Sequence, residues 1–249
     1  MGLLKNIKIF KSWGNIYLTK YGLLHDEFIC KTRTGQKFLV RPWTADMKTI
    51  KSVFAKKNYV NEFVDIMPNS IVVDVGANIG AFTIFAAQWA KQVFAFEPEP
   101  ENFHLLCSNI ELNGFKNVIP SRMAIAKKRG KQDFYIAKKE HSSSHSFFLP
   151  EYEKKIKVQT LSIMDVIERE SLAKIDFLKL DCEGSENDII EGLSFETAKK
   201  IEQISLEFHQ VNSYSAEDLV EKLTVLGFDV RSGGKRGYFF ARRNGEKKQ

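Results

Sequence analysis

Short runs of β-branched and aromatic residues alternate with stretches of helical periodicity from about residue 70 onward. The runs that predict buried strands are 71–75, 92–97, 117–125, 175–181 and 203–208. Apolar residues recur at the three- and four-residue spacing of amphipathic helices over 79–89, after residue 103 and over 216–226. Strands and helices that alternate at this length predict an α/β fold, a parallel sheet with helices on both faces.

The two ends of the chain depart from this alternation. Near the C-terminus, two strand-like segments, 227–231 and 237–242, flank a Ser-Gly-Gly-Lys turn and predict a closing antiparallel hairpin. The first 58 residues predict a small α+β cap. It should hold a basic amphipathic helix, a hairpin over 27–40 that turns near Thr34-Gly35, and a helix near 48–57. We therefore expect a cap over 1–58, a main domain over 59–243 and a basic tail over 244–249.

An insertion over 131–162 also falls outside the alternation. Two strand-like runs, 133–137 and 155–161, flank a polar loop that carries His141 and His145. Loops of this kind often shape a substrate pocket, so we expect the insertion on the substrate side. The two histidines are expected to be ordinary polar loop residues, with contact to the substrate as the alternative.

Composition excludes several classes of protein. A chain of 249 residues with 43% hydrophobic and 27% charged residues is typical of a globular protein and not of a disordered one. The longest apolar run, 81–90, is too short for a membrane span. The N-terminal residues lack the long apolar core of a secretory signal. Three widely spaced cysteines, Cys30, Cys107 and Cys182, argue against a disulfide framework or a structural zinc. We therefore expect a cytoplasmic protein.

The net charge of +6 raises the question of an anionic partner. The last eight residues contribute +3, which favours a solvated tail over a nucleic-acid arm. Leu3, Leu4, Ile7 and Phe10 share one face of the predicted N-terminal helix, with lysines elsewhere. Packing of this face against the domain is the preferred interpretation, and peripheral contact with an anionic lipid surface is the alternative.

A glycine-containing turn follows the first strand of the predicted sheet. In Asp74-Val75-Gly76-Ala77-Asn78-Ile79-Gly80, Gly76 allows a tight turn and the close approach of a ligand, and Gly80 allows helix and strand to pack closely. Free N–H groups at the helix start would face the ligand. Glu97 ends the second strand 17 residues after Gly80, near the spacing at which an acid binds ribose hydroxyls. The pattern is neither GxGxxG nor a Walker loop, and it predicts a nucleoside site.

Three segments carry a resemblance to a known family. VVDVGANIG, AFEPEPENFHLLCSNIELNG and DFLKLDCEGSENDIIEG resemble the hallmark segments of the FkbM-type family of class I S-adenosylmethionine-dependent methyltransferases, over residues 55–245. The resemblance implies a Rossmann-like, mostly parallel seven-stranded sheet and S-adenosylmethionine as the cofactor. It implies a cofactor site in which Glu97 binds the ribose and Tyr59 closes over the cofactor. The methionine side would contact Asp74, Gly76, Asn78 and Gly80, with Asp181 also at the cofactor, and the adenine would lie near Arg122, Met123 and Ala124.

Methyl transfer to a hydroxyl requires the removal of a proton by a base or with the help of a metal. Asp181 and Glu183 follow the fourth strand, and Glu207 and His209 mark the end of the fifth, at the edge that holds the cofactor. Alternation along a strand would place Glu207 and His209 on one side, where His209 could act as the base and Glu207 could orient it. An ordinary hydrogen-bonded pair is the alternative. The four residues could also bind a divalent metal, but no densely spaced ligand set supports one, so we expect none.

The absence of two motifs narrows the chemical class of the methyl acceptor. The fourth strand ends without the Asn/Asp-Pro-Pro-Tyr motif of many amino-methyltransferases, and no cysteine stands in the Pro-Cys context of a cytosine-C5 enzyme. An oxygen acceptor is therefore favoured, and the resemblance implies O-methylation of a small metabolite or a glycan by in-line displacement. The alternatives are an RNA methyltransferase and a non-catalytic nucleoside-binding protein of the same fold, although a nucleic-acid partner is not expected.

Overall fold

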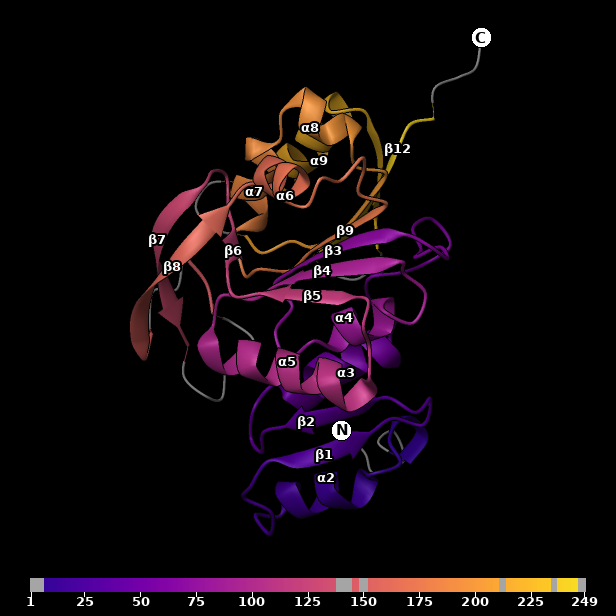
Figure 1. Ribbon diagram of the computed structural model, residues 1–249, viewed down its shortest axis with the longest axis vertical. Coiled ribbons are helices and arrows are strands. Elements are labelled where there is room, and N and C mark those ends of the chain that lie inside the picture. Colours follow the sequence, from indigo (N-terminus) through magenta and orange to yellow (C-terminus); the bar gives the residue numbers. More distant parts are fainter. Residues whose placement is uncertain (1–6, 138–144, 148–151, 211–213, 234–236, 246–249) are drawn as a thin grey trace.

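A seven-stranded sheet with the strand order β11–β12–β10–β9–β3–β4–β5 forms the centre of the molecule (Figure 1). Its strands are β3 (Ile71–Val75), β4 (Gln92–Phe96), β5 (Val118–Ser121), β9 (Phe177–Leu180), β10 (Gln203–Glu207), β11 (Phe228–Ser232) and β12 (Tyr238–Arg243). Neighbouring strands are parallel, except that β12 pairs antiparallel with β10 and β11. The predicted Rossmann-like sheet with an antiparallel closing hairpin is confirmed. The structure is a computed structural model that describes residues 7–137, 145–147, 152–210, 214–233 and 237–245.

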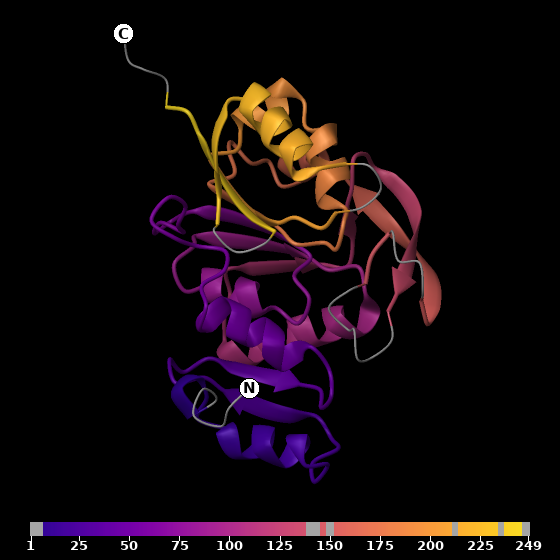
Figure 2. The ribbon, with the colours of Figure 1, turned by 180° about the vertical axis from the view of Figure 1, so that it is seen from behind.

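Helices cover both faces of this sheet. Figures 1 and 2 show α3 (Asp46–Phe54), α4 (Ala81–Ala86) and α5 (Pro100–Asn113) on one face. The other face carries α6 (Ile163–Arg169), α7 (Glu186–Gly192), α8 (Phe195–Lys199) and α9 (Ala216–Val225). Strand alternation divides the core accordingly, since Val72 and Phe177 pack toward the first face and Val73 and Leu178 toward the second. The short helices α6, α7 and α8 were not predicted from the periodicity. Within the described ranges, no helix has the length and apolar character that crossing a bilayer requires.

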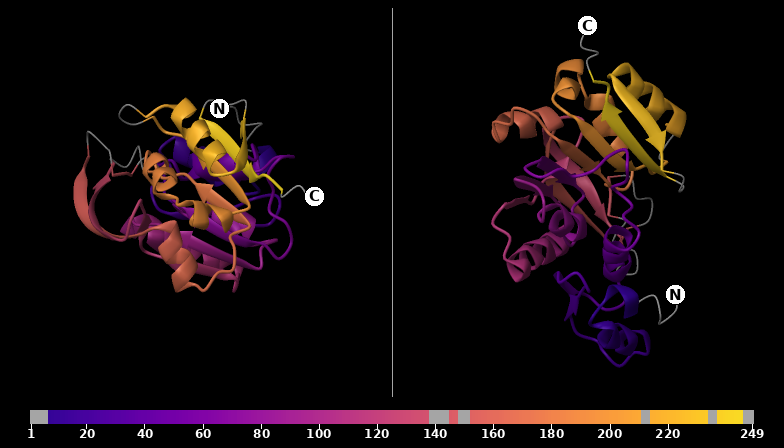
Figure 3. Two further views of the ribbon diagram at one scale, coloured as in Figure 1. Left: turned by 90° about the horizontal axis from the view of Figure 1, so that it is seen from above. Right: turned by 90° about the vertical axis from the view of Figure 1, so that its right-hand side faces the viewer.

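The cap lies at one end of the molecule, beyond α3 and α5 (Figures 1 and 3). It contains α2 (Trp13–Lys20) and the predicted hairpin, formed by β1 (Phe28–Lys31) and β2 (Lys37–Val40). The hairpin joins the main domain through Phe38, whose ring meets that of Phe54 at 5.6 Å, and through side-chain amides of α5 that bond to the β2 backbone. The predicted basic N-terminal helix falls partly outside the described residues. Its described end stops before Phe10, which is buried in a bridge to Thr32.

The insertion forms a second, three-stranded sheet of order β6–β8–β7. Its strands are β6 (Ala124–Ile125), β7 (Gly130–Ile136) and β8 (Lys154–Leu161), and Figure 1 shows them at one side of the main sheet. The single strand predicted over 117–125 is wrong. The chain leaves the main sheet after Ser121, and Ala124 and Ile125 pair instead with Thr160 and Leu161 of β8.

The turn between β3 and α4 is packed closely against the end of β9. Gly76 has φ of 72°, and a Cβ atom there would lie 1.8 Å from the carbonyl oxygen of Asp181. Gly80 has φ of 87°, and its Cβ would lie 2.7 Å from Cδ1 of Leu106 on α5. We predicted that the missing side chain of Gly76 leaves room for a ligand. In the structure that space accommodates the backbone of Asp181, so the glycine brings two strand ends together.

Replacement of Gly76 by alanine is therefore expected to disrupt the fold. The new methyl group collides with the Asp181 backbone, and the positive φ adds strain, so we expect Gly76→Ala to lower the free energy of unfolding by about 3 kcal/mol. Gly114 is the matched control, because it has φ of 69° but no heavy atom within 4 Å of its Cβ position. Gly114→Ala should cost about 1 kcal/mol. Urea denaturation measures both, and equal losses would contradict this account of Gly76.

Candidate functional site

A cavity of about 510 Å³ lies at the carboxyl ends of the central parallel strands. Its floor is formed by the turn after β3 and by the residues that end β4, β9 and β10. Two other parts of the chain supply its walls. Helix α3 contributes Lys48, Thr49 and Ser52, and the insertion contributes Phe134 and Phe147, with His145 from the loop. Helix α3 and the insertion therefore both shape this cavity.

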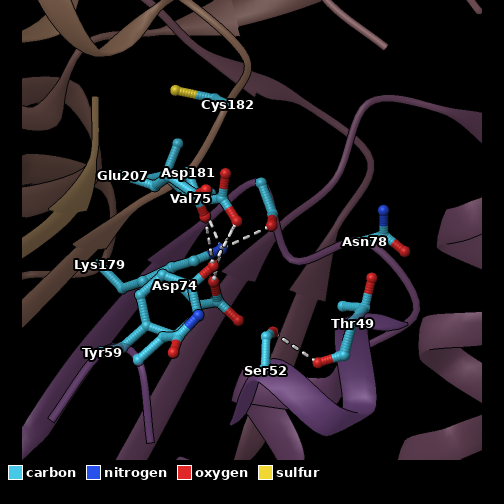
Figure 4. Close-up of polar contacts among 12 residues, drawn as sticks. Thr49, Ser52, Tyr59, Asp74, Val75, Asn78, Lys179, Asp181, Cys182 and Glu207 are labelled. Carbon is cyan, nitrogen blue, oxygen red and sulfur yellow. Dashed lines mark hydrogen bonds and ion pairs between the residues drawn. The ribbon is translucent and has the colours of Figure 1, made fainter. Parts of the chain in front are cut away.

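A buried lysine on β9 connects the strand ends beneath the cavity (Figure 4). Lys179 is 2% exposed, and its Nζ atom donates to the carbonyl oxygens of Gly76 at 2.7 Å and Val75 at 3.1 Å. The same atom lies 3.0 Å from Oδ1 of Asp74 and 4.0 Å from Oδ2 of Asp181. Burial alone would lower the pKa of Lys179, but the charges of Asp74 and Asp181 outweigh it and raise the pKa. Lys179 is therefore a cation that fixes the turn after β3 against β9.

Two of the predicted cofactor residues lie below the cavity surface. Asp74 is fully buried, accepts a hydrogen bond from the Thr83 hydroxyl at 2.6 Å and pairs with Lys179. Gly80 lies against Leu106, as described above. Neither residue lines the cavity, whereas Gly76 and Asn78 of the same turn do. In this geometry Asp74 and Gly80 shape the turn, and Gly76 and Asn78 present it to a ligand.

Glu97 lines the cavity directly after β4 and is 5% exposed. Its Oε2 atom accepts the N–H of Asn78 at 2.8 Å, and its Oε1 atom accepts the N–H of Glu99 at 2.9 Å. Burial raises its pKa to about 7, although both backbone donors favour the charged form. Asn78 is held at φ of 52° while its side chain accepts the N–H of Ile79. The carboxylate is thus fixed at the cavity wall with lone pairs left for hydroxyl groups.

The three residues predicted near the adenine differ in position. Ala124 lines the cavity together with Ile125 and Phe96. The side chain of Arg122 is exposed, and that of Met123 lies by Arg169, whose Nη1 is 3.2 Å from the Met123 sulfur. Of the three, Ala124 alone lies at the cavity surface.

Two tyrosines hold the carboxylates of Asp181 and Glu207 at the cavity surface. The Tyr59 hydroxyl lies 2.5 Å from Oδ2 of Asp181 and 3.4 Å from Oε2 of Glu207. The Tyr238 hydroxyl donates to Oε2 of Glu207 and accepts from the Asn58 amide at 2.8 Å. Burial raises the pKa of Tyr59 and of Glu207. Tyr59, expected to close over the cofactor, therefore stays protonated and holds two acids at the cavity surface.

His209 lies beside the cavity with a carboxylate at each ring nitrogen. Its Nδ1 atom is 3.2 Å from Oε1 of Glu186, and its Nε2 atom is 3.5 Å from Oε2 of Glu183. Glu186 is fully buried and also accepts the N–H groups of Cys182 and Gly184. Burial alone would lower the pKa of His209, but the two carboxylates raise it to about 10. Burial is also the main reason that the pKa of Glu183 is raised to about 8.

The predicted pairing of Glu207 with His209 is not found. Strand β10 ends at Glu207, so the alternation of a strand no longer fixes the direction of His209. Glu207 instead accepts from tyrosines, and His209 contacts Glu183 and Glu186. Lys179, Glu186 and Tyr238 were not predicted as site residues. A lysine inside the apolar run of β9 is the one local signal that pointed to any of them.

A divalent metal has one candidate set of ligands in the described part of the chain. Asp181, Glu186 and His209 each offer one atom, and these atoms lie within 4.8 Å of one another. In the present geometry the Glu186 carboxylate is occupied by two backbone N–H groups and by His209. A protonated imidazole also has no lone pair for a metal. The arrangement therefore favours a hydrogen-bonded imidazolium over a metal centre.

Known proteins share both the sequence pattern and the fold. Residues 74–230 match the model of the Methyltransferase FkbM domain. The chain is 27% identical over 212 residues to 31-O-demethyl-FK506 methyltransferase FkbM of Streptomyces tacrolimicus, which covers 72% of this chain and 80% of that protein. It is 28% identical over 126 residues to hexuronic acid methyltransferase AglP of Haloferax volcanii, which covers 51% of each.

A solved structure shows the same fold. The crystal structure of methyltransferase FkbM from Methylobacillus flagellatus aligns with a TM-score of 0.51 at 12% identity, covering 78% of this chain. This chain spans 47% of the length of that protein. The family match covers more than half of the chain and includes the turn after β3, Glu97, Asp181 and Glu207. The chain therefore belongs to the FkbM family of S-adenosylmethionine-dependent methyltransferases.

Proposed function

We propose that this protein transfers a methyl group from S-adenosylmethionine to a hydroxyl group of a small metabolite or a glycan. The observation that carries the proposal is the placement of Asp181, Glu183 and Glu207 in one cavity with Glu97 and the glycine turn. One relative acts on 31-O-demethyl-FK506 and another on a hexuronic acid, and both support an oxygen acceptor. Carboxylates beside the transfer point supply the base that such an acceptor needs.

The cavity residues fit the cofactor in shape and charge. A volume of about 510 Å³ suits a small-molecule ligand. Glu97 would accept hydrogen bonds from the ribose hydroxyls, and Phe96, Ala124 and Ile125 offer an apolar surface to the adenine. When bound, S-adenosylmethionine supplies the methyl group on a positively charged sulfonium. The carboxylates of Asp181 and Glu207 would complement that charge and orient the donor.

We assign the proton-accepting role to Glu183. Asp181 and Glu207 receive hydrogen bonds from tyrosine hydroxyls, whereas Glu183 contacts His209 at 3.5 Å and keeps a quarter of its side chain exposed. A pKa of about 8 gives this carboxylate a high proton affinity near neutral pH, which suits a general base. His209 and Glu186 would fix its position. Tyr59 and Tyr238 would keep Asp181 and Glu207 in place around the acceptor.

Removal of the Glu97 carboxylate is expected to weaken cofactor binding. Hydrogen bonds to a charged group contribute about 1.5–3 kcal/mol, so Glu97→Ala should raise the Kd for S-adenosylmethionine at least tenfold. Glu97→Gln keeps one acceptor oxygen, so its Kd should lie between the Kd of Glu97→Ala and that of the wild type. Because the pKa of Glu97 is about 7 and the charged form binds, the affinity of the wild type should fall below pH 7.

Isothermal titration calorimetry at pH 6 and pH 8 tests this, with S-adenosylhomocysteine as the second ligand. Glu111→Ala is the matched control, since Glu111 is exposed on α5 and does not line the cavity. A wild-type protein that binds neither ligand would overturn the proposed function. Unchanged affinity in Glu97→Ala would overturn the role of this residue alone.

The assignment of Glu183 predicts a pH-dependent rate. The ionised form accepts the proton, so turnover should rise with pH and level off above about pH 8. Glu183→Gln should lower turnover at least a hundredfold, abolish this rise and leave cofactor affinity near the wild-type value. Transfer of labelled methyl groups to the small-molecule fraction of a cell extract measures the turnover and its pH dependence, and calorimetry measures the cofactor affinity. The exposed Glu168→Gln is the control. A variant that keeps the wild-type pH profile would exclude Glu183 as the base.

Methyl transfer is expected to continue when divalent metals are removed. The pKa of about 10 keeps His209 protonated at neutral pH, and both of its ring nitrogens form ion pairs, so we expect no metal at the candidate ligand set. The same assay in the presence of excess EDTA should give an unchanged rate. Loss of activity that Mg²⁺ or Mn²⁺ restores would instead assign a metal to Asp181, Glu186 and His209.

A further inference from the structure

Positive charge is concentrated in the cap. Residues 1–58 contain 12 Lys and Arg against 3 Asp and Glu, whereas the rest of the chain contains 25 against 28. The C-terminal tail is therefore not the main source of the net positive charge. Residues 1–58 therefore have a net charge of +9, and the rest of the chain has a net charge of −3.

A second cavity, of about 480 Å³, lies within this N-terminal segment, between the hairpin turn at residues 32–34 and α3. Four cationic residues line it, Lys8, Arg33, Lys51 and Lys56, together with the apolar Ile9 and Phe54. No acidic residue is among the described residues that line it. None of the four cations forms an ion pair within the described ranges, in contrast to Arg41, which pairs with Asp46 at 2.9 Å.

Lys51 and Arg33 are the two cations of this cavity that neighbouring groups hold in place. Lys51 is half-buried over the ring of Phe10, and burial lowers its pKa without a carboxylate to compensate. Arg33 donates its Nε–H to the carbonyl of Ile7, and its two terminal nitrogens have no partner among the described residues. A guanidinium held by one edge offers the other to an anion, and phosphate matches that geometry. A multiply charged phosphate would also compensate several lysines at once.

We propose that this second cavity binds a phosphate or pyrophosphate group carried by the methyl acceptor. Lys56, which follows α3 in the chain, lines both cavities, and Lys48 of α3 lines the first, so cationic side chains extend from the first cavity to the second. An acceptor could place its hydroxyl at Glu183 and its phosphate between Arg33 and Lys51. The acceptor class is then a phosphorylated sugar or metabolite. The assignment of the phosphate to the acceptor rests on the proposed function, but the anion site does not.

Calorimetry with inorganic pyrophosphate tests the site itself. The wild type, saturated with S-adenosylhomocysteine, should bind pyrophosphate with an affinity that falls as salt is added. Lys51→Met and Arg33→Gln should each weaken this binding at least tenfold and leave S-adenosylmethionine affinity unchanged. Lys91→Met is the matched control, because Lys91 is exposed and lines neither cavity. Urea denaturation tests whether each variant folds. If Lys51→Met does not fold, Lys51→Gln replaces it.

The outcomes separate this inference from the proposed function. Absence of pyrophosphate binding, or binding that both substitutions leave unchanged, overturns the anion site while cofactor binding still supports the methyltransferase. Labelled methyl transfer should reach nucleotide-activated hexoses and hexuronic acids in preference to the same free sugars, and equal transfer overturns the acceptor class. Vesicles of phosphatidylglycerol are the third arm. Vesicle binding that requires Lys51 and Arg33, without binding of pyrophosphate, would assign the site to a lipid headgroup and overturn the proposal.

Discussion

The site depends on one buried charge, the ammonium group of Lys179. Transfer of such a group out of water costs several kcal/mol, so it persists only where fixed partners surround it. Here the partners are Asp74 and the carbonyl oxygens of Val75 and Gly76. Those carbonyls belong to the end of β3 and to the turn after it, which line the first cavity. The conformation of the turn therefore determines whether the Lys179 charge is compensated. A change in the turn would leave the buried ammonium group without its carbonyl partners.

The parts of the fold that the sequence predicts are those set by local patterns. The alternation around Ile71–Val75 and Phe177–Leu180 predicts strands, and the turn from Gly76 to Gly80 and the acid at Glu97 mark the ends of two of them. The partner of Lys179 follows from register instead, because Asp74 lies directly opposite Lys179 across the β3–β9 pair. Register depends on contacts more than 100 residues apart in sequence, which periodicity does not encode. The break after Ser121 and the direction of His209 are long-range features of the same kind.

Three glutamates near the cavity, Glu183, Glu186 and Glu207, have the same side chain but different hydrogen-bond partners. Glu186 is buried but satisfied by two backbone N–H groups and His209, and Glu207 is held by tyrosine hydroxyls. Glu183, at a positive φ of 54°, is close to the acids Asp181, Glu186 and Glu207 and to one cation, His209. Burial and those like charges raise its pKa, whereas His209 opposes the rise. Sequence places three glutamates near one sheet edge, but their surroundings give the three carboxyl groups different hydrogen-bond partners.

The charge of the two cavities adds a constraint on how a substrate can bind. The first cavity places carboxylates at the strand ends, while Lys48 of α3 and Lys56, just after that helix, also line it. The second cavity continues this positive surface with Lys51 and Arg33. Under the proposed function, a cationic donor would be attracted to the acids and an anionic acceptor to the lysines and Arg33, so each would be disfavoured in the place of the other. Such a field would orient an acceptor before any contact specific to its hydroxyl forms, and α3, which lines both cavities, is the element that sets the distance between the two ends.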